Sequence, residues 1–167
     1  MNSNVIRTAE TTDLPAIMQL VVSAKAIMRK SNNAKQWNDG YPSEDVIMED
    51  IKSGTCLIIM HGNTTVGSFV LKPGPDPTYS NIYGGQWLND NPYHVIHRIT
   101  SREDAHGIFG EMLRYCFSIS RNIRIDTHKD NAIMRHLLEK NGFRYCGIIH
   151  IANGDERLAY QKTTMLK

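Results

Sequence analysis

The sequence has no long hydrophobic run, which limits where the protein can reside. Nowhere do about eighteen apolar residues follow one another, and the start MNSNVIRTAE has no basic stretch leading into an apolar one. A membrane-spanning helix needs the first feature, and a secretory signal needs the second. We therefore expect no membrane partner and a cytoplasmic location.

The sequence also has few cysteines and little net charge. The three cysteines, Cys56, Cys116 and Cys146, lack CxxC spacing, and each sits in an apolar run. This pattern predicts neither a disulfide framework nor a zinc site, so no metal is expected. The formal charge is only +2, too small an excess to favour nucleic acid as a partner.

The remaining composition is that of an ordinary globular protein. Of the 167 residues, 41% are hydrophobic and 22% are charged, close to the averages for globular domains. A chain of this length buries roughly 70% of its unfolded surface without crosslinks. We expect a single domain over residues 1–167.

Hydrophobic periodicity predicts a mixed α/β domain. Period-two patterns and turn residues separate strands from helices. Gly62 and Asn63 are expected to supply positive φ angles in a hairpin, and Gly54 to end the second helix. The long segment 73–92 is rich in proline, glycine and aromatic residues and predicts a loop. The expected strands are 5–9, 56–60, 65–71, 94–100, 122–126, 143–151 and 157–161, and the expected helices are 14–28, 43–53, 108–120 and 131–140.

The stretch SREDAHGIFGEML places two glycines, Gly107 and Gly110, at the start of an apolar helix. Unpaired backbone N–H groups at a helix start attract anions, and glycine lets a phosphate approach the backbone. The stretch lacks both the Gly-Lys-Ser/Thr of a P-loop and a full GxGxxG, which disfavours ATP and NAD. A simple strand-to-helix connection is the alternative.

A second segment identifies a family resemblance. The helix NAIMRHLLEKNGF begins with Asn131 and ends at Gly142 and Phe143, and it resembles the second cofactor motif of the GNAT superfamily of acyl-CoA-dependent N-acetyltransferases. Residues 105–110 resemble the Gln/Arg-x-x-Gly-x-Gly/Ala loop of that superfamily. In this loop Ala105 replaces the Gln or Arg, Ile108 replaces the first glycine, and the second is kept as Gly110.

The resemblance covers the whole chain and implies a fold. The GNAT fold is an α+β arrangement with about four helices on a mostly antiparallel sheet of six to seven strands. This sheet is splayed between strands four and five. The stretches QWNDGYPSEDVIMEDI, YHVIHRI, RIDTHKDN and FRYCGII look like a group of uncharacterised bacterial acetyltransferases.

The resemblance also implies acetyl-CoA (coenzyme A) as the cofactor. In the family, pantetheine pairs with the exposed backbone of strand four, and the pyrophosphate lies at the next helix start. The residues expected to bind the cofactor are Ile99, Thr100, Arg102, Ala105, His106, Gly107, Ile108, Phe109, Gly110 and Asn131.

The proton-transfer groups are less regular. Many relatives place a tyrosine acid seven residues after the motif asparagine, but here that position is Leu138. A histidine has an unperturbed pKa of about 6.5 and suits a base, so His97 is a candidate base or water relay, although packing could equally explain it. His128 and Tyr145 are candidate acids.

The acceptor pocket of this fold is expected around the early helices and the loops of strands three to five. Trp37, Tyr41, Trp87 and Tyr93 are the expected acceptor-binding residues. Aromatic rings could enclose a cation or an apolar ligand, but they could equally cover a core edge or form a homodimer surface.

Three functions follow, in order of preference. The first is an N-acetyltransferase acting on a primary amine of a small molecule or a protein, by direct attack of the amine on the thioester. The second is a catalytically silent acyl-CoA-binding or regulatory module. The third is an interaction domain without a cofactor.

Overall fold

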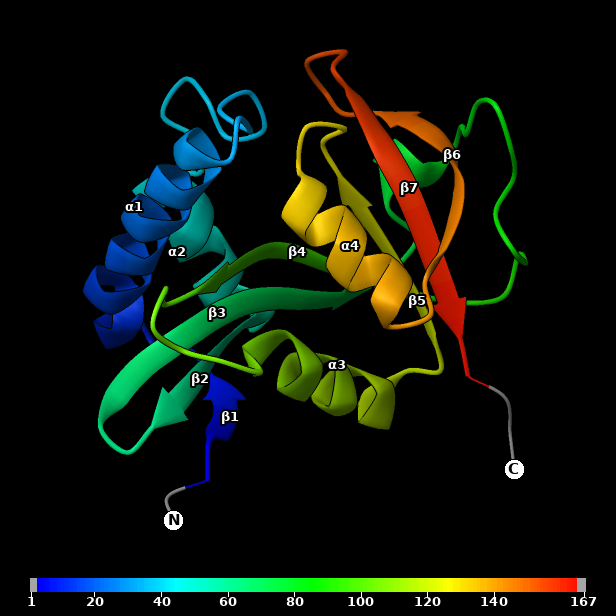
Figure 1. Ribbon diagram of the computed structural model, residues 1–167. Helices are drawn as coiled ribbons and strands as arrows, with labels where there is room; N and C mark the ends of the chain where they lie inside the picture. Colours follow the sequence, from blue (N-terminus) through cyan, green and yellow to red (C-terminus); the bar gives the residue numbers. More distant parts are fainter. Residues whose placement is uncertain (1–2, 165–167) are drawn as a thin grey trace.

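A computed structural model describes residues 3–164, which build one seven-stranded sheet with helices on both faces (Figure 1). The strands are β1 (Val5–Thr8), β2 (Cys56–His61), β3 (Thr64–Pro73), β4 (His94–Ser101), β5 (Asn122–Thr127), β6 (Arg144–His150) and β7 (Glu156–Thr163). The helices are α1 (Leu14–Lys30), α2 (Glu44–Lys52), α3 (Ile108–Ile119) and α4 (Ala132–Lys140), with short 3₁₀ turns η1 (Thr11–Asp13) and η2 (Pro77–Tyr79).

The strand order is β1-β2-β3-β4-β5-β7-β6. All neighbouring pairs are antiparallel except β4 and β5. The sequence-based prediction of a mostly antiparallel sheet with about four helices is therefore confirmed.

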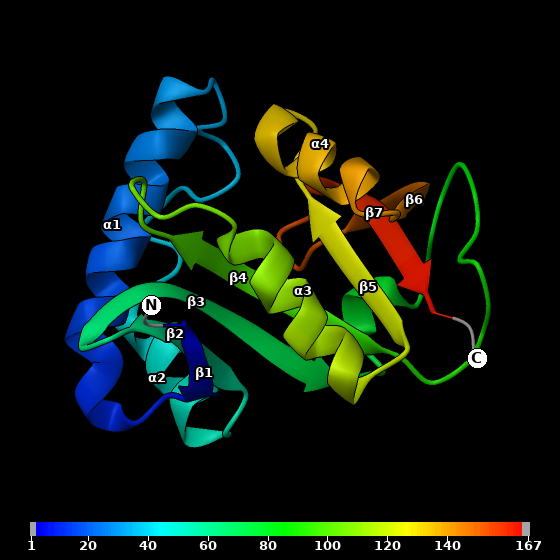
Figure 2. The same ribbon diagram turned by 60° about the horizontal axis from the view of Figure 1, so that its bottom comes forward.

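The two central strands separate soon after they meet. β4 and β5 pair only through His94 with Ile123 and Val95 with Arg124, and Figure 2 shows the two arrows diverging beyond that point. From Ile96 onward β4 pairs with β3 alone. The predicted splay is present, and it leaves backbone N–H and C=O groups of β4 without partners on the side that faces β5. The opening between the diverging strands β4 and β5 is the wedge.

Apolar side chains on the two faces of the sheet form separate cores. On one face Phe69 and Ile96 pack with Met112 of α3 and Leu138 of α4. On the other face Ile58 of β2 packs with residues of α1 and α2. The sheet is thus covered on both faces, and both cores hold the wedge open at a fixed place.

The ends of the helices follow local sequence chemistry. The Ser43 hydroxyl accepts the Val46 N–H at 3.3 Å and begins α2, and the Asn131 side chain accepts the Met134 N–H at 3.0 Å and begins α4. Both are N-cap bonds. In the β2–β3 hairpin only Gly62 has a positive φ, 59°. The prediction of a positive φ at Asn63 is wrong because one glycine at the first turn position suffices.

Within residues 3–164, no helix combines the length and the apolar character needed to cross a membrane.

Candidate functional site

Two cavities meet where β4 and β5 separate. The wide cavity has a volume of about 550 Å³ and the narrow cavity about 140 Å³. Four residues line both cavities: Met28, Ile99, Asn131 and Met134. The wedge therefore connects one binding space to the other.

The narrow cavity is bounded by the C-terminal half of α1, the end of β4 and the first turns of α3 and α4. Its wall includes Ile99 and Thr100, then Ile108 and Phe109, and Asn131. Five of the predicted cofactor-binding residues thus lie around a single, mostly apolar cavity.

The first turn of α3 offers unpaired donors beside this cavity. Gly107 is the N-cap residue, it has a φ of 74°, and no side chain caps the helix. The first N–H groups of a helix have no intrahelical partner. A Cβ placed on Gly107 would meet no atom within 4 Å, and one on Gly110 would meet only the Arg114 guanidinium, at 3.7 Å. The space in front of the helix is open, which suits a phosphate group.

Arg102 and His106 are exposed on the loop that leads to α3. The Arg102 guanidinium forms two hydrogen bonds with Asp104, both 2.9 Å, and this pairing raises the pKa of Arg102. Arg102, Ala105 and His106 line a separate cavity of about 500 Å³ on the β1 side of the loop, and none of the three lines the narrow cavity.

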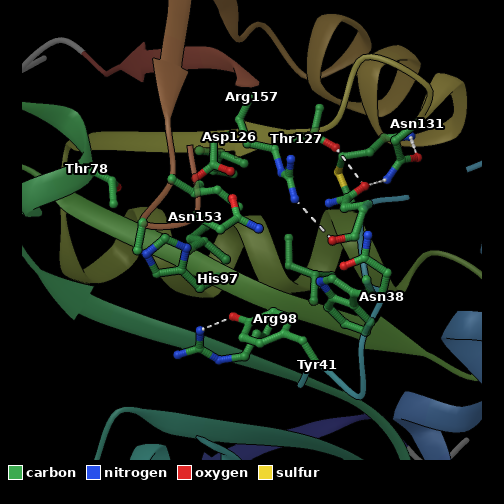
Figure 3. Close-up of a pocket in the computed structure, with 18 of the residues that line it drawn as sticks. Asn38, Tyr41, Thr78, His97, Arg98, Asp126, Thr127, Asn131, Asn153 and Arg157 are labelled. Atoms are coloured by element: carbon green, nitrogen blue, oxygen red, sulfur yellow. Dashed lines mark hydrogen bonds between the residues drawn. The ribbon is translucent and has the colours of Figure 1, made fainter. Parts of the chain in front are cut away.

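The wide cavity is lined by residues from several separate segments, and some of these residues are labelled in Figure 3. The loop between α1 and α2 contributes Trp37 and Tyr41, β4 contributes His97, β5 contributes Asp126, and the β6–β7 turn contributes Asn153. Two of the four predicted acceptor-binding aromatics, Trp37 and Tyr41, are therefore in its wall.

A β-bulge shapes β4 within this wall. Ser68 of β3 pairs with Thr100 while Val70 pairs with His97, so β4 carries one extra residue. Arg98 lies in the bulge with a φ of 50°, a left-handed conformation that is uncommon for a side-chain-bearing residue and is held by its surroundings.

Those surroundings are an ion pair with α2. Arg98 donates two hydrogen bonds to the buried Asp50, at 2.6 and 2.7 Å, and one to the Tyr41 hydroxyl at 2.9 Å. Burial opposes the charge on Arg98, but the Asp50 carboxylate outweighs it and raises the Arg98 pKa. The pair connects α2, the α1–α2 loop and the bulge in one rigid group.

His97 faces the wide cavity and contacts a buried acid. Its Nε2 lies 2.9 Å from Oδ2 of Asp76, which is only 6% exposed. Burial opposes ionisation of Asp76, yet hydrogen bonds from His97 and Thr78 prevail and hold the pKa of that carboxyl below its usual range. Asp76 is therefore an anion at neutral pH.

A second acid lies across the cavity. The phenol of Tyr79 donates to Oδ2 of Asp126 at 2.7 Å. Burial and then the charge of Asp126 raise the pKa of Tyr79 well above its usual range, so Tyr79 stays protonated and keeps donating. Asp126 itself is half-buried and lines the cavity.

Gln36 connects the α1–α2 loop to α4 and β7 by hydrogen bonds. Its Oε1 accepts hydrogen bonds from Asn33, at 2.9 Å, and Asn131, at 2.8 Å, and its backbone C=O accepts from Arg157 of β7 at 3.1 Å. The loop thus contacts α4 and β7 as well as its own helix, and Figure 3 shows Arg157 and Asn131 on either side of it. This docking closes one side of the wide cavity.

The structure places the other two predicted aromatics elsewhere. Trp87 and Tyr93 hold the Arg124 guanidinium between their rings, at 4.1 and 3.9 Å from the ring centroids. Neither ring is in the wall of the wide cavity. Cation–π stacking fixes the loop 74–93 against β5, so these two residues serve loop packing.

The two predicted acids also lie outside the cavity wall. His128 is buried, and its Nδ1 accepts the Asp130 N–H at 3.0 Å; burial and then Arg157 lower its pKa. Tyr145 is 50% exposed on β6 and packs edge-on against Tyr160 at 5.8 Å. Leu138 is fully buried in the core, and its side chain has no ionisable group that could donate a proton.

The three cysteine thiols are buried, and burial makes them poor nucleophiles. Burial raises the pKa of both Cys56 and Cys116 to about 12 and also raises that of Cys146. A thiol with a raised pKa forms little thiolate at neutral pH, and the thiolate is the nucleophile. Acyl transfer through a cysteine of the chain is disfavoured.

Sequence reasoning missed the acids that matter here. For Asp76 the stretch GPDPTY predicts only a loop, and for Asp126 the preceding pattern predicts only the end of a strand. An aspartate two residues before a threonine whose N–H it accepts is a local turn pattern. That pattern signals a fixed carboxylate but does not show that His97 lies beside it.

No protein-family profile and no curated protein matches the chain. Solved structures do match. An acetyltransferase of the GNAT family from Streptococcus agalactiae 2603 is 31% identical, with a TM-score of 0.89 over 98% of this chain and 96% of that one. A GNAT-family acetyltransferase from Listeria monocytogenes 4b F2365 is 20% identical, with a TM-score of 0.71 over 96% and 95%.

A more distant match is a chain of the NatC complex bound to Gag peptide and CoA. It is 14% identical, with a TM-score of 0.63 over 98% of this chain and 99% of that one; this likeness concerns the fold. The match to the Streptococcus protein extends over nearly the full length of both chains at more than 30% identity. The chain therefore belongs to the GNAT family of acetyltransferases.

Proposed function

We propose that the protein transfers an acetyl group from acetyl-CoA to a primary amine of a small molecule or a peptide, by direct attack of the amine on the thioester. The observation that carries this proposal is the meeting of the two cavities at the β4–β5 wedge. Two reactants held on the two sides of one opening react without a covalent enzyme intermediate.

The pantetheine arm of acetyl-CoA is proposed to enter the narrow cavity, with its phosphates at the adjoining helix start. Pantetheine amides need backbone partners, and β4 beyond Val95 pairs with β3 only. A pyrophosphate needs N–H donors without a side chain in the way, and Gly107 and Gly110 provide an uncapped first turn. The macrodipole of α3 adds attraction for the phosphate charge.

The proposed cofactor-binding residues divide by role. Ile99 and Thr100 are proposed to pair with pantetheine, and residues 105–110 to surround the pyrophosphate. Asn131 lines both cavities, so it would border the acyl end. Arg102 and His106 would reach the outer phosphates, and for Arg102 this requires exchanging its exposed Asp104 partner. When bound, the cofactor supplies an activated thioester carbonyl.

The wide cavity suits an ammonium group of the acceptor. Asp126 lines the cavity and accepts one hydrogen bond from Tyr79 through Oδ2, which leaves its other oxygen for an ammonium group. Trp37 and Tyr41 add aromatic surface beside it, which also favours a cation. His97 is proposed as the base that removes a proton from the incoming ammonium, directly or through a water molecule.

Departure of the thiolate needs no dedicated acid in this proposal. The usual position of the acid is Leu138, which is buried. His128 and Tyr145 remain sequence predictions for this role, but neither lines the wide cavity. The second proton of the amine can leave with the thiolate as the C–S bond breaks, because the amine nitrogen carries a positive charge once it has bonded to the carbonyl carbon and is then acidic enough to protonate a thiolate.

The decisive experiment is a thiol-release assay with acetyl-CoA and a panel of amines and peptides, with acetylated products identified by mass spectrometry. We expect release of CoA that depends on one class of amine and gives product with one added acetyl group. Binding of acetyl-CoA without turnover on any amine would favour the silent module. Absence of binding would favour an interaction domain. A homodimer, predicted as an option from sequence, is checked by sedimentation in the same preparation.

A further inference from the structure

Asp76 is held in place by bonds that do not involve His97. Its Oδ1 accepts the backbone N–H of Thr78 at 2.9 Å and the Thr78 hydroxyl at 2.7 Å. Its own backbone N–H donates to the Tyr93 phenol at 2.9 Å, and Tyr93 is in turn stacked on Arg124. The carboxylate therefore has a fixed orientation, with only Oδ2 directed at the imidazole.

This orientation determines which nitrogen of His97 carries the proton. An ionised carboxylate only accepts hydrogen bonds, so Nε2 must be the donor across the 2.9 Å contact. In the neutral ring Nδ1 then holds the free lone pair. Among residues 3–164 the only hydrogen bond recorded for the ring is the one to Asp76, and the ring lines the wide cavity. Nδ1 is therefore free of hydrogen-bond partners among these residues and can accept a hydrogen bond from a ligand.

We infer that Asp76 is a positioning residue for acyl transfer, which holds His97 in the Nε2–H tautomer so that Nδ1 accepts the proton of the acceptor ammonium. This inference rests on the proposed function. Nδ1 takes one proton from the ammonium, and the freed amine lone pair forms the C–N bond at the thioester carbonyl. The C–S bond then breaks, and the second amine proton leaves with the thiolate as CoA thiol.

Two substitutions at the same position separate this role from simple support of the loop. In Asp76→Asn, the amide oxygen keeps both Thr78 donors, so the NH₂ group lies where Oδ2 was and donates to Nε2. The proton of His97 must then move to Nδ1, and the base is lost. In Asp76→Ala, the ring has no partner and samples both tautomers. Asn should therefore be the more damaging change, although it preserves more of the native contacts.

Nitrogen-15 spectra of histidine-labelled protein identify the tautomer without an activity measurement, when they are recorded over a pH series up to the point where the ring signals no longer change. The His97 signals are assigned by comparison with His97→Gln. We expect Nε2–H in the parent and in the control Asp90→Asn, an exposed residue of the same loop outside the cavity wall. We expect Nδ1–H in Asp76→Asn. An Nδ1–H ring in the parent, or an unchanged tautomer in Asp76→Asn, overturns the inference.

Kinetics on an accepted amine provide the second readout. We expect kcat to fall on the order of 100-fold in Asp76→Asn, a typical share for a general base, and roughly tenfold in Asp76→Ala, with unchanged acetyl-CoA affinity in both. A larger loss in Ala than in Asn indicates a purely structural role and overturns the inference. Failure of the parent to turn over any amine contradicts the proposed function instead, while the tautomer result still decides the geometry.

Discussion

The two cavities on either side of the wedge offer a ligand different kinds of groups. Around the narrow cavity and the start of α3, the groups suited to a ligand are backbone N–H and C=O groups, with glycine at Gly107 and Gly110. Around the wide cavity, they are side chains from several segments, among them His97, Asp126 and Tyr41. Backbone recognition depends on the fold, whereas side-chain recognition depends on residues that can change independently.

This difference means that residues of the wide cavity can change without altering the backbone groups of the other side. A cradle of backbone groups is kept wherever the strand, turn and helix are kept. The wall of the wide cavity combines an anchored loop, a bulge, the buried Asp76 and the half-buried Asp126. We therefore expect substitutions on the two sides to have separable effects, on cofactor affinity and on acceptor use.

The largest effect is expected from Gly110→Arg. A Cβ at this position meets only Arg114, at 3.7 Å, so the fold should tolerate the change while the long side chain enters the phosphate space. Acetyl-CoA affinity should fall on the order of 100-fold, or about 2.8 kcal/mol, by calorimetric titration. Ser118→Arg, at an exposed position of the same helix, is the control and should bind normally. Equal affinity in both variants would place the phosphates elsewhere.

A smaller effect is expected from Asp126→Asn on the acceptor side. The amide oxygen can still accept the Tyr79 hydroxyl, so the loop contact should survive while the negative charge is lost. KM for an ammonium acceptor should rise roughly tenfold, about 1.4 kcal/mol, with acetyl-CoA affinity unchanged. Steady-state kinetics on the parent, this variant and Asp90→Asn measure it. A loss of cofactor binding in Asp126→Asn would break the proposed separation of the two sides.

Tyr41→Phe should have a smaller effect still. It removes one hydrogen bond to Arg98 and leaves the two bonds from Arg98 to Asp50 in place. A single hydrogen bond to a charged group contributes about 1.5–3 kcal/mol when buried, and less here because Tyr41 is 40% exposed. We expect a two- to fivefold loss of acceptor kcat/KM, near or below 1 kcal/mol. An unchanged kcat/KM would show that the α1–α2 loop is positioned by Gln36 alone.

The smallest expected effect is a pH dependence of the melting temperature that His128 causes. The pKa of His128 is lowered in the folded protein, first by burial and then by Arg157, so the unfolded chain binds the proton more readily. The stability from neutral His128 is complete above the unfolded pKa of about 6.5 and is lost as pH falls through the lower folded pKa. Tm should decrease modestly between pH 7.5 and 5.5, and less so in His128→Gln. An equal decrease in both proteins would assign the pH dependence to other groups.

Much of the fold could be predicted because it follows from local patterns. The capping residues Ser43 and Asn131, the hairpin at Gly62 and the alternating strands are all visible in short stretches of sequence. The splay of β4 from β5 followed from the family resemblance alone, since no pattern of residues marks where two parallel strands separate. The extra residue in the β4 bulge at Arg98 was not predicted, because its partner Asp50 lies far away in the chain.

The candidate site was predictable only in part, for the same reason. Trp37 and Tyr41 of the α1–α2 loop and His97 of β4 all line the wide cavity, because this loop lies beside β4 and contacts it through Tyr41 and Arg98. Trp87 and Tyr93 instead stack on Arg124, a pairing across the sheet that composition does not reveal. The contact between Asp76 and His97 joins a loop turn to a strand, and only the register of β3 and β4 brings the two together.

Hydrogen exchange with and without acetyl-CoA tests the separation of the two sides most directly. If the cofactor occupies the narrow cavity and the α3 start, amides in 96–101 and 105–111 should exchange more slowly with acetyl-CoA present, while those in 37–41 and 151–153 should not change. Protection confined to 37–41 and 151–153, or no protection at all, would contradict the assignment of the two cavities.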